Sequence, residues 1–357
     1  MKKIGYILTF IFMGFGSLSQ TMEENYALAL DKLSCMMNQT CDLSFKKAVF
    51  IVEGTYFDNE MDEELFDFEI QKLVQLCNGF TKSRKLVYSA KDKEKVLKYA
   101  AIFGIMKDTI AVQLDSNTIG YHYPYSYDFE DIWGAESWSN MFVSKLIARK
   151  KGNCHSLPFL YKILAKEMGI EAHIAVAPNH FYIKLQNEKS GWYNTELTSG
   201  IFPIDAWLMA SGYIHLDAVV NKLYMEALDD KQSIALCVID LAKGYQKKNG
   251  TDNNFVLQCC DTALHYYPNY INALLLKSEI LKKAFEAKME AYGVKHPAEI
   301  FEVPEAKLLF DKMTSLYAKI HQLGYRKMPK EMYLKWLTSL QKEREKYENK
   351  NITNFNN

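Results

Sequence analysis

The stretch from residue 157 to 197 constrains the fold most, because a helical pattern is followed directly by strand patterns. Apolar residues recur at steps of three and four from Leu157 to Met168, and Gly169 provides a natural stop. Residues 172–177 are almost wholly apolar, which is typical of a buried strand. A helix that leads directly into strands predicts an α+β fold.

A hairpin is expected immediately after this first strand. Apolar and polar residues alternate from His180 onward, residues 187–191 form a polar turn, and 192–197 is the next strand candidate. A turn centred near Glu188 would place His180 opposite Glu196 in an antiparallel pair. A register slipped by two residues would still leave them diagonal neighbours.

Cys154 lies three residues before Leu157, where the helical pattern begins. Free backbone N–H groups and the helix dipole favour a thiolate there, and they lower the ordinary thiol pKa of about 8.5 toward neutrality. Pro158 removes one backbone donor from the first turn. Either that turn is irregular or the helix begins nearer Ser156, and both leave Cys154 at the helix entrance.

A thiol, an imidazole and a carboxylate in this arrangement are the parts of a cysteine nucleophile system, with Glu196 orienting His180 and His180 activating Cys154. Two other histidines are nearby. His173 falls among buried strand residues and is expected to be structural, while His155 is expected to line the cleft.

Several stretches together resemble the transglutaminase-like superfamily: 149–154, the helix through 168–172, 179–180 and 192–198. The resemblance covers residues 140 to 205. It implies a papain-like arrangement, in which a helix bearing Cys154 packs on an antiparallel sheet bearing His180 and Glu196. The family more often has Asp-Pro-Thr where this chain has Glu196-Leu197-Thr198.

The resemblance implies acyl transfer at an amide or peptide bond through a thioester, with a peptide or protein as substrate and no cofactor. Water as acceptor would make the protein a peptidase or deamidase, whereas an amine acceptor would make it a transamidase. The alternative is a non-catalytic module that binds peptide or protein. Metal binding by Cys154, His180 and Glu196 is a further alternative, in which the protein would be a metal hydrolase.

The region before Cys154 is rich in aromatic residues, with four tyrosines in 121–127 followed by Trp133 and Trp138. These residues could form the rim of a peptide-binding cleft or fill a core. An amide from this region, such as that of Asn140, could form an oxyanion hole with the Cys154 backbone N–H.

The chain has 357 residues and 43 residues of each charge sign, so no basic excess indicates nucleic-acid binding. Lys2 and Lys3 precede an apolar run that ends in the small residues of 16–19, which predicts a signal peptide over 1–19. We therefore expect an exported protein, periplasmic or secreted, without stable membrane insertion after cleavage. An uncleaved N-terminal anchor is the alternative.

The cysteine count is seven, which is odd, so pairing of the other six would leave Cys154 free. Cys35 and Cys41 flank a polar turn and could form a local disulfide bond. The remaining cysteines include Cys237, Cys259 and Cys260, which fall in helical patterns where small buried residues are expected.

The expected organisation after the signal peptide is an N-terminal helical region over 20–115, the transglutaminase-like core over 116–222, a helical region over 223–347 and a disordered tail over 348–357. Small, apolar and proline positions around 241–275 resemble a tetratricopeptide repeat, a helix-pair fold that commonly binds other proteins. The resemblance is to bacterial transglutaminase-like proteins with such a tail, and it implies a possible protein partner for this region.

Overall fold

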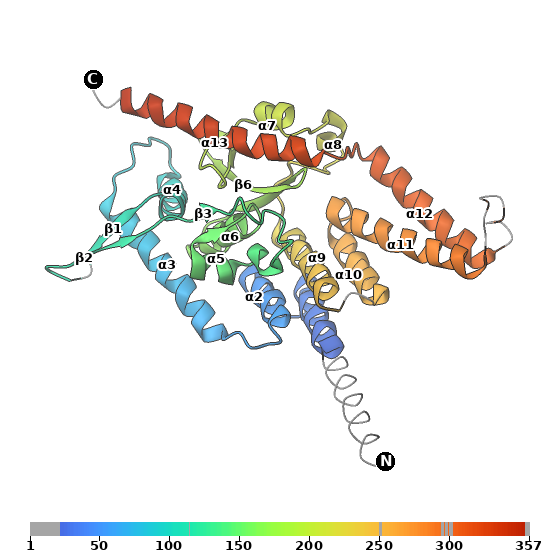
Figure 1. Ribbon diagram of the computed structural model, residues 1–357. Helices are drawn as coiled ribbons and strands as arrows, with labels where there is room; N and C mark the ends of the chain where they lie inside the picture. Colours follow the sequence, from blue (N-terminus) through green and yellow to red (C-terminus); the bar gives the residue numbers. More distant parts are fainter. Residues whose placement is uncertain are drawn as a thin grey trace, which may run out of the picture. The chain divides into compact units, whose positions relative to one another are not determined.

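The computed structural model describes residues 22–113, 115–249, 252–293 and 303–353, together with 296 and 299. The fold is mixed α+β and mostly helical, with small sheets (Figure 1). The predicted signal peptide lies outside the described residues. Among the described helices, none has both the length and the apolar character needed to cross a membrane.

The chain forms two compact units, and each combines two separate stretches of sequence. One unit contains the residues up to Asp62 and Asp230–Leu309, and the other contains Glu63–Asp229 and Phe310–Asn357. The boundaries expected from the sequence divide the chain consecutively instead. Residues 63–115 and 310–347 therefore group with the stretch that bears Cys154.

The first unit is helical. Its members are a helix over 22–37, α2 (Phe45–Tyr56), α9 (Asp230–Asn249), α10 (Asn253–Tyr266) and α11 (Ile271–Ala291). α9 packs against α2 and α10, and α10 packs against α11. Tyr26 and Tyr245 meet edge to face in the core, with ring centroids 5.2 Å apart. A disulfide bond joins Cys35 and Cys41, as the flanking turn allowed.

The second unit surrounds a three-stranded antiparallel sheet. Its helices are α3 (Glu63–Ser83), α4 (Lys93–Lys107), α5 (Val143–Arg149), α6 (Ser156–Glu167), α7 (Asp205–Ser211), α8 (Leu216–Val220) and α13 (Lys330–Thr353). Its strands are β1 (Ile110–Gln113), β2 (Ile119–His122), β3 (Ser126–Tyr127), β4 (Lys151–Gly152), β5 (His173–Ala177), β6 (His180–Asn187) and β7 (Gly191–Thr195). β1 falls inside the region that was expected to be helical. α12 (Pro304–Gln322) spans the boundary between the units.

The order of the main sheet is β5-β6-β7, with β6 in the centre. Pro178 and Asn179 connect β5 to β6, and Asn179 adopts the left-handed backbone that such a tight turn requires, at φ 57°. In the next hairpin Asn187 pairs with Gly191, so the turn centres one residue later than expected. The predicted register is therefore wrong by two positions.

α6 packs on this sheet, as the sequence predicted, and Gly169 ends it with φ 70°. Phe181 of β6 stacks on Phe159 of α6, with ring centroids 6.2 Å apart. The alternate residues of β6 were expected to face away from the apolar core. They are buried as well, and Lys184 reaches a backbone carbonyl at Met225. Because β6 is covered on both faces, the polar residues there need protein partners.

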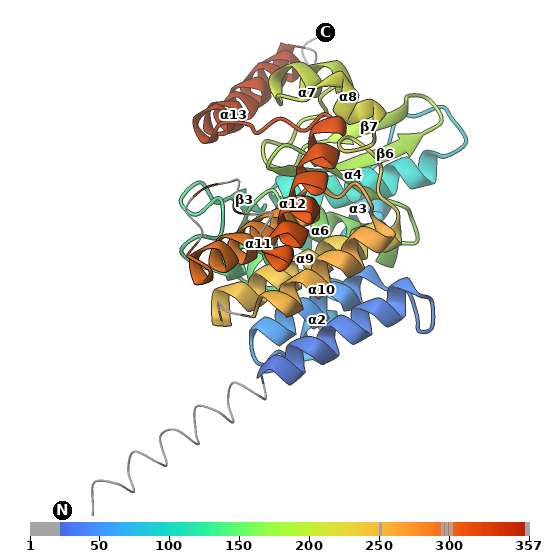
Figure 2. The same ribbon diagram turned by 90° about the vertical axis from the view of Figure 1, so that its right-hand side faces the viewer.

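α13 lies beside α7, as Figures 1 and 2 both show. The indole N–H of Trp336 on α13 donates a hydrogen bond to the Ser211 hydroxyl of α7 at 3.0 Å. The helix continues to Thr353, into the segment that was expected to be disordered. Lys and Glu in this segment have high helix propensity, which favours the extension.

Candidate functional site

Cys154 lies at the start of α6, which begins at Ser156, the second of the two alternatives for Pro158. The Asn153 side-chain oxygen accepts hydrogen bonds from the backbone N–H groups of His155 at 3.0 Å and Ser156 at 3.2 Å. In return, the Ser156 hydroxyl accepts from the Asn153 N–H at 3.1 Å. This reciprocal cap fixes the first turn and holds the thiol at the positive end of the helix.

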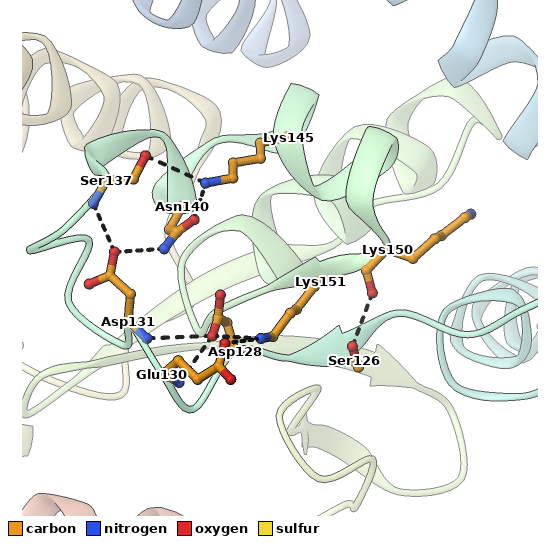
Figure 3. Close-up of polar contacts among 9 residues, drawn as sticks. All are labelled: Ser126, Asp128, Glu130, Asp131, Ser137, Asn140, Lys145, Lys150 and Lys151. Carbon is orange, nitrogen blue, oxygen red and sulfur yellow. Dashed lines mark hydrogen bonds and ion pairs between the residues drawn. The ribbon is translucent and has the colours of Figure 1, made fainter.

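Gly152 allows this cap to form at close range. A Cβ atom at that position would collide with the Ser156 hydroxyl and would lie 2.7 Å from Leu146 Cδ1. Gly152 also pairs with Tyr127, which joins β4 to β3. Next to this pair, the Ser126 hydroxyl donates to the Lys150 carbonyl at 3.2 Å (Figure 3). The cap at Ser156 and the pairing with β3 thus both fix the backbone just before Cys154.

His180 and Glu196 are in direct contact despite the register error. His180 Nε2 donates a hydrogen bond to Glu196 Oε2, and Glu196 Oε1 accepts from the Thr198 backbone N–H at 2.6 Å. Glu196 lies just beyond β7, where its backbone bridges to Ile201. The two side chains are almost completely buried. Both carboxylate oxygens are therefore engaged, and the imidazole is held in a fixed orientation.

The charges of this pair reach the thiol. Burial opposes ionisation of His180, but the adjacent Glu196 carboxylate raises its pKa to about 10. Burial likewise opposes ionisation of Cys154, yet the neighbouring His180 and the Tyr333 hydroxyl lower the pKa of the thiol. His180 and Thr198 hold the pKa of Glu196 below its ordinary value against the effect of burial. These shifts favour a thiolate beside an imidazolium over a neutral pair.

Other free cysteines have the opposite character. Burial raises the pKa of the thiols of Cys77 and Cys260 to about 12, and it raises the pKa of Cys259 well above its ordinary value. These three side chains are buried, whereas Cys154 is partly exposed. An accessible thiol with a lowered pKa has the properties of a nucleophile, while the buried thiols have those of inert core residues.

The two rival histidines have structural contacts. His173 Nδ1 lies 2.9 Å from the Leu228 carbonyl, as a structural residue would. His155 Nδ1 lies 2.9 Å from the Met141 carbonyl, and its ring packs on Phe159 with centroids 4.0 Å apart. His155 was expected to line the cleft, but its ring is buried against aromatic residues because it follows the cap into the first turn of α6.

Asn140 was expected as one possible oxyanion donor, but its amide is already engaged (Figure 3). Its Nδ2 donates to Asp131 Oδ2 at 2.7 Å, and its oxygen accepts from Lys145. The buried Asp131 carboxylate also accepts three backbone N–H groups of the same loop, including that of Ser137 at 3.0 Å. The Asn140 amide thus contacts Asp131 and Lys145 rather than Cys154.

The aromatic stretch is partly exposed and partly buried, so only part of it fills a core. Tyr121 and Tyr123 are exposed, whereas Tyr125 and Tyr127 are buried. The ring of Trp133 lies 4.8 Å from that of Tyr333 on α13.

α13 contributes two residues to the site that the sequence did not indicate. The Tyr333 hydroxyl lies 3.5 Å from Cys154 Sγ and 3.5 Å from His180 Nδ1. The ring of Trp336 meets that of His180 edge to face, with centroids 4.8 Å apart. No local pattern could have identified Tyr333, because its partners lie more than 150 residues away in the chain.

Among the residues that the structure describes, no cluster of three or more His, Cys, Asp or Glu side chains is suited to hold a metal ion. Comparison with models of protein families, with curated proteins and with solved structures gave no match to this chain.

Proposed function

We propose that this protein is a cysteine acyl-transfer enzyme that acts on amide or peptide bonds through a thioester. The observation that carries the proposal is the state of Cys154. It is a partly exposed thiol with a lowered pKa at the start of a helix, beside an imidazole that a buried carboxylate orients. Nucleophile, base and orienting group are the three parts that such chemistry requires.

The fold proposed here is transglutaminase-like in the stretch around Cys154. The support is the packing of α6 on the antiparallel sheet β5-β6-β7, with Cys154 before the helix and His180 and Glu196 on or next to the sheet. For α9, α10 and α11 we propose a tetratricopeptide-like role as a protein-binding scaffold. The support is their consecutive pairwise packing.

In the proposed reaction the Cys154 thiolate attacks the carbonyl carbon of the substrate. A carbon–sulfur bond forms, the carbonyl electron pair moves to oxygen, and a tetrahedral oxyanion results. Collapse of this intermediate breaks the carbon–nitrogen bond, and the amine leaves with a proton from His180. Water or a second amine, deprotonated by His180, then attacks the thioester and regenerates the thiolate.

The experiment is to trap the acyl-enzyme with p-nitrophenyl acetate near neutral pH. We expect an acetyl thioester at Cys154, located by peptide mass spectrometry, while the buried Cys77 and Cys260 remain unmodified. The Cys154→Ala variant should lose the rapid release of p-nitrophenolate. Release at an unchanged rate from that variant would contradict the proposal and would favour a non-catalytic binding module.

A further inference from the structure

Two tyrosine hydroxyl groups lie next to the Cys154 thiol. Tyr333 reaches it from α13, with 3.5 Å between its Oη and Cys154 Sγ. Tyr127 comes from β3, whose pairing with β4 places it opposite Gly152, two residues before Cys154. The thiol and both phenols interact electrostatically with one another. Donors from two distant parts of the chain thus converge on the sulfur.

The Tyr127 hydroxyl is buried, and the polar groups beside it are the Tyr333 hydroxyl and the Cys154 thiol. Buried polar groups need partners of this kind, and native structures leave few without one. An anion that forms beside the thiol during the reaction would accept a hydrogen bond from the Tyr127 hydroxyl. Asn140 does not supply this donor, since its amide is bound by Asp131 and Lys145.

Both hydroxyl groups keep their protons at neutral pH. Burial raises the pKa of Tyr127 and of Tyr333 well above the ordinary value of a phenol. Each is therefore a hydrogen-bond donor to any anion beside it. In the resting state Tyr333 donates to the Cys154 thiolate, which is one cause of the lowered pKa of that thiol.

The negative charge moves a short distance during acyl transfer. The thiolate becomes a neutral sulfur when the carbon–sulfur bond forms, and the charge passes to the oxygen on the adjoining carbon. Donors placed beside the sulfur then lie beside this oxyanion, and they are released from the thiolate at the moment the oxyanion needs them. Preorganised donors of this kind stabilise the transition state more than the ground state.

We propose that the hydroxyl groups of Tyr127 and Tyr333 are catalytic oxyanion donors for acyl transfer at Cys154, an inference that rests on the proposed function. The step balances, because one carbon–sulfur bond forms as the carbonyl π pair becomes the oxyanion lone pair. When the oxyanion collapses, the leaving group departs with its bonding electrons. An amine takes its proton from His180, and the phenols keep theirs throughout.

A rival role for Tyr333 is that of a plug. α13 buries its apolar face here, with Tyr333, Leu337 and Leu340 almost fully buried, and such a helix could simply cover the thiol. The two roles predict opposite changes in the reactivity of Cys154 when Tyr333 is replaced. Loss of a donor slows acylation, whereas loss of a plug increases the reactivity of Cys154 toward every reagent.

The test compares two reagents on Tyr127→Phe and Tyr333→Phe. Iodoacetamide alkylates the thiolate by displacement at a saturated carbon, which forms no oxyanion, whereas p-nitrophenyl acetate acylates it through one. We expect acylation per thiolate to fall about 10- to 100-fold in each variant. Alkylation per thiolate should stay within about twofold of wild type, because sulfur itself remains accessible.

Tyr125→Phe is the matched control. Tyr125 is also buried, but its ring lies under the Lys150 ammonium group at 4.0 Å and it is not one of the groups that interact with the thiol. Neither rate should change in this variant. Thermal unfolding of Tyr127→Phe should stay within a few degrees of wild type, since the substitution keeps the buried ring and removes only the hydroxyl. Slower acylation could then not be attributed to misfolding.

An unchanged ratio of acylation to alkylation in both tyrosine variants would overturn the proposal. An increase of both rates in Tyr333→Ala, which removes the ring as well as the hydroxyl, would overturn it in favour of the plug. If wild-type Cys154 is alkylated but forms no acetyl thioester, the proposed function itself fails and the inference falls with it. Failure of the inference alone would leave wild-type acylation intact.

Discussion

Replacement of His180 by Ala should change Cys154 from a reactive thiolate into an ordinary or suppressed thiol. Burial opposes ionisation of Cys154, and the contact with His180 is the main influence that lowers the pKa of the thiol. Without the imidazole, burial is opposed only by the Tyr333 hydroxyl and the helix start. The thiol pKa should then rise to about 8.5, the value of an unperturbed cysteine, or above it.

The buried cysteines give the scale of the effect. Cys77 and Cys260, which have no imidazole among the influences on their ionisation, have a pKa of about 12. At pH 6 a thiol with a pKa of about 8.5 is about 0.3% ionised, and one of about 12 is ionised to about one part in a million. A more basic thiolate is intrinsically about threefold more reactive per pKa unit, which offsets part of this loss. The net alkylation rate of Cys154 at pH 6 should fall by about 10-fold if its pKa rises to about 8.5, and by more if it approaches the pKa of the buried cysteines.

The assay is iodoacetamide alkylation of Cys154 from pH 5 to 9, followed by peptide mass spectrometry. Wild type should keep more of its rate than His180→Ala as the pH falls, because the pKa of its thiol is lower. His180→Ala should lose its rate progressively below its raised pKa. His173→Ala, in the same sheet but bonded to the Leu228 carbonyl, is the control and should follow wild type. Equal rates for wild type and His180→Ala across this range would refute the reasoning.

Two further substitutions test the supports of the site. Glu196→Gln removes the carboxylate that raises the pKa of His180 to about 10, so that pKa should fall and His180 should lose its proton at lower pH. Imidazole NMR titration measures it, and an unchanged pKa would contradict the assignment. Gly152→Ala forces a Cβ to 2.7 Å from Leu146 Cδ1 and should lower the free energy of unfolding by about 1–3 kcal/mol in denaturant titrations. Gly79→Ala, at an open position on α3, should instead raise the free energy of unfolding by about 0.5–1 kcal/mol. Equal effects of Gly152→Ala and Gly79→Ala would contradict the packing account.

Local sequence patterns placed Cys154 at a helix start and His180 beside Glu196 on a hairpin, whereas the expectation that the thiol lies close to this pair came from the family resemblance. The helical repeat after Cys154 defined α6, and the alternation around the polar turn defined the hairpin. The register was wrong by two positions because the turn centres on Lys189 rather than on Glu188. A slip of two keeps side chains on the same face, so the contact between His180 and Glu196 survived the error.

The surroundings of the site could not be predicted in this way. Tyr333 and Trp336 reach it from a helix far along the chain, and helical periodicity says which face is apolar but not what that face covers. Asn153 was within reach, since an Asn followed by Ser at the third position is a capping pattern. The engagement of Asn140 by Asp131 depends on a loop whose shape no periodicity describes.

The ionisation of Cys154 tests the central claim most directly. Thiolate absorbance, measured against pH as the difference between wild type and Cys154→Ser, reports this thiol alone. The account predicts a midpoint clearly below the ordinary value of about 8.5, because His180 carries a positive charge beside the sulfur. A midpoint at or above about 8.5 would contradict it, since Cys154 would then ionise no more readily than an unperturbed cysteine.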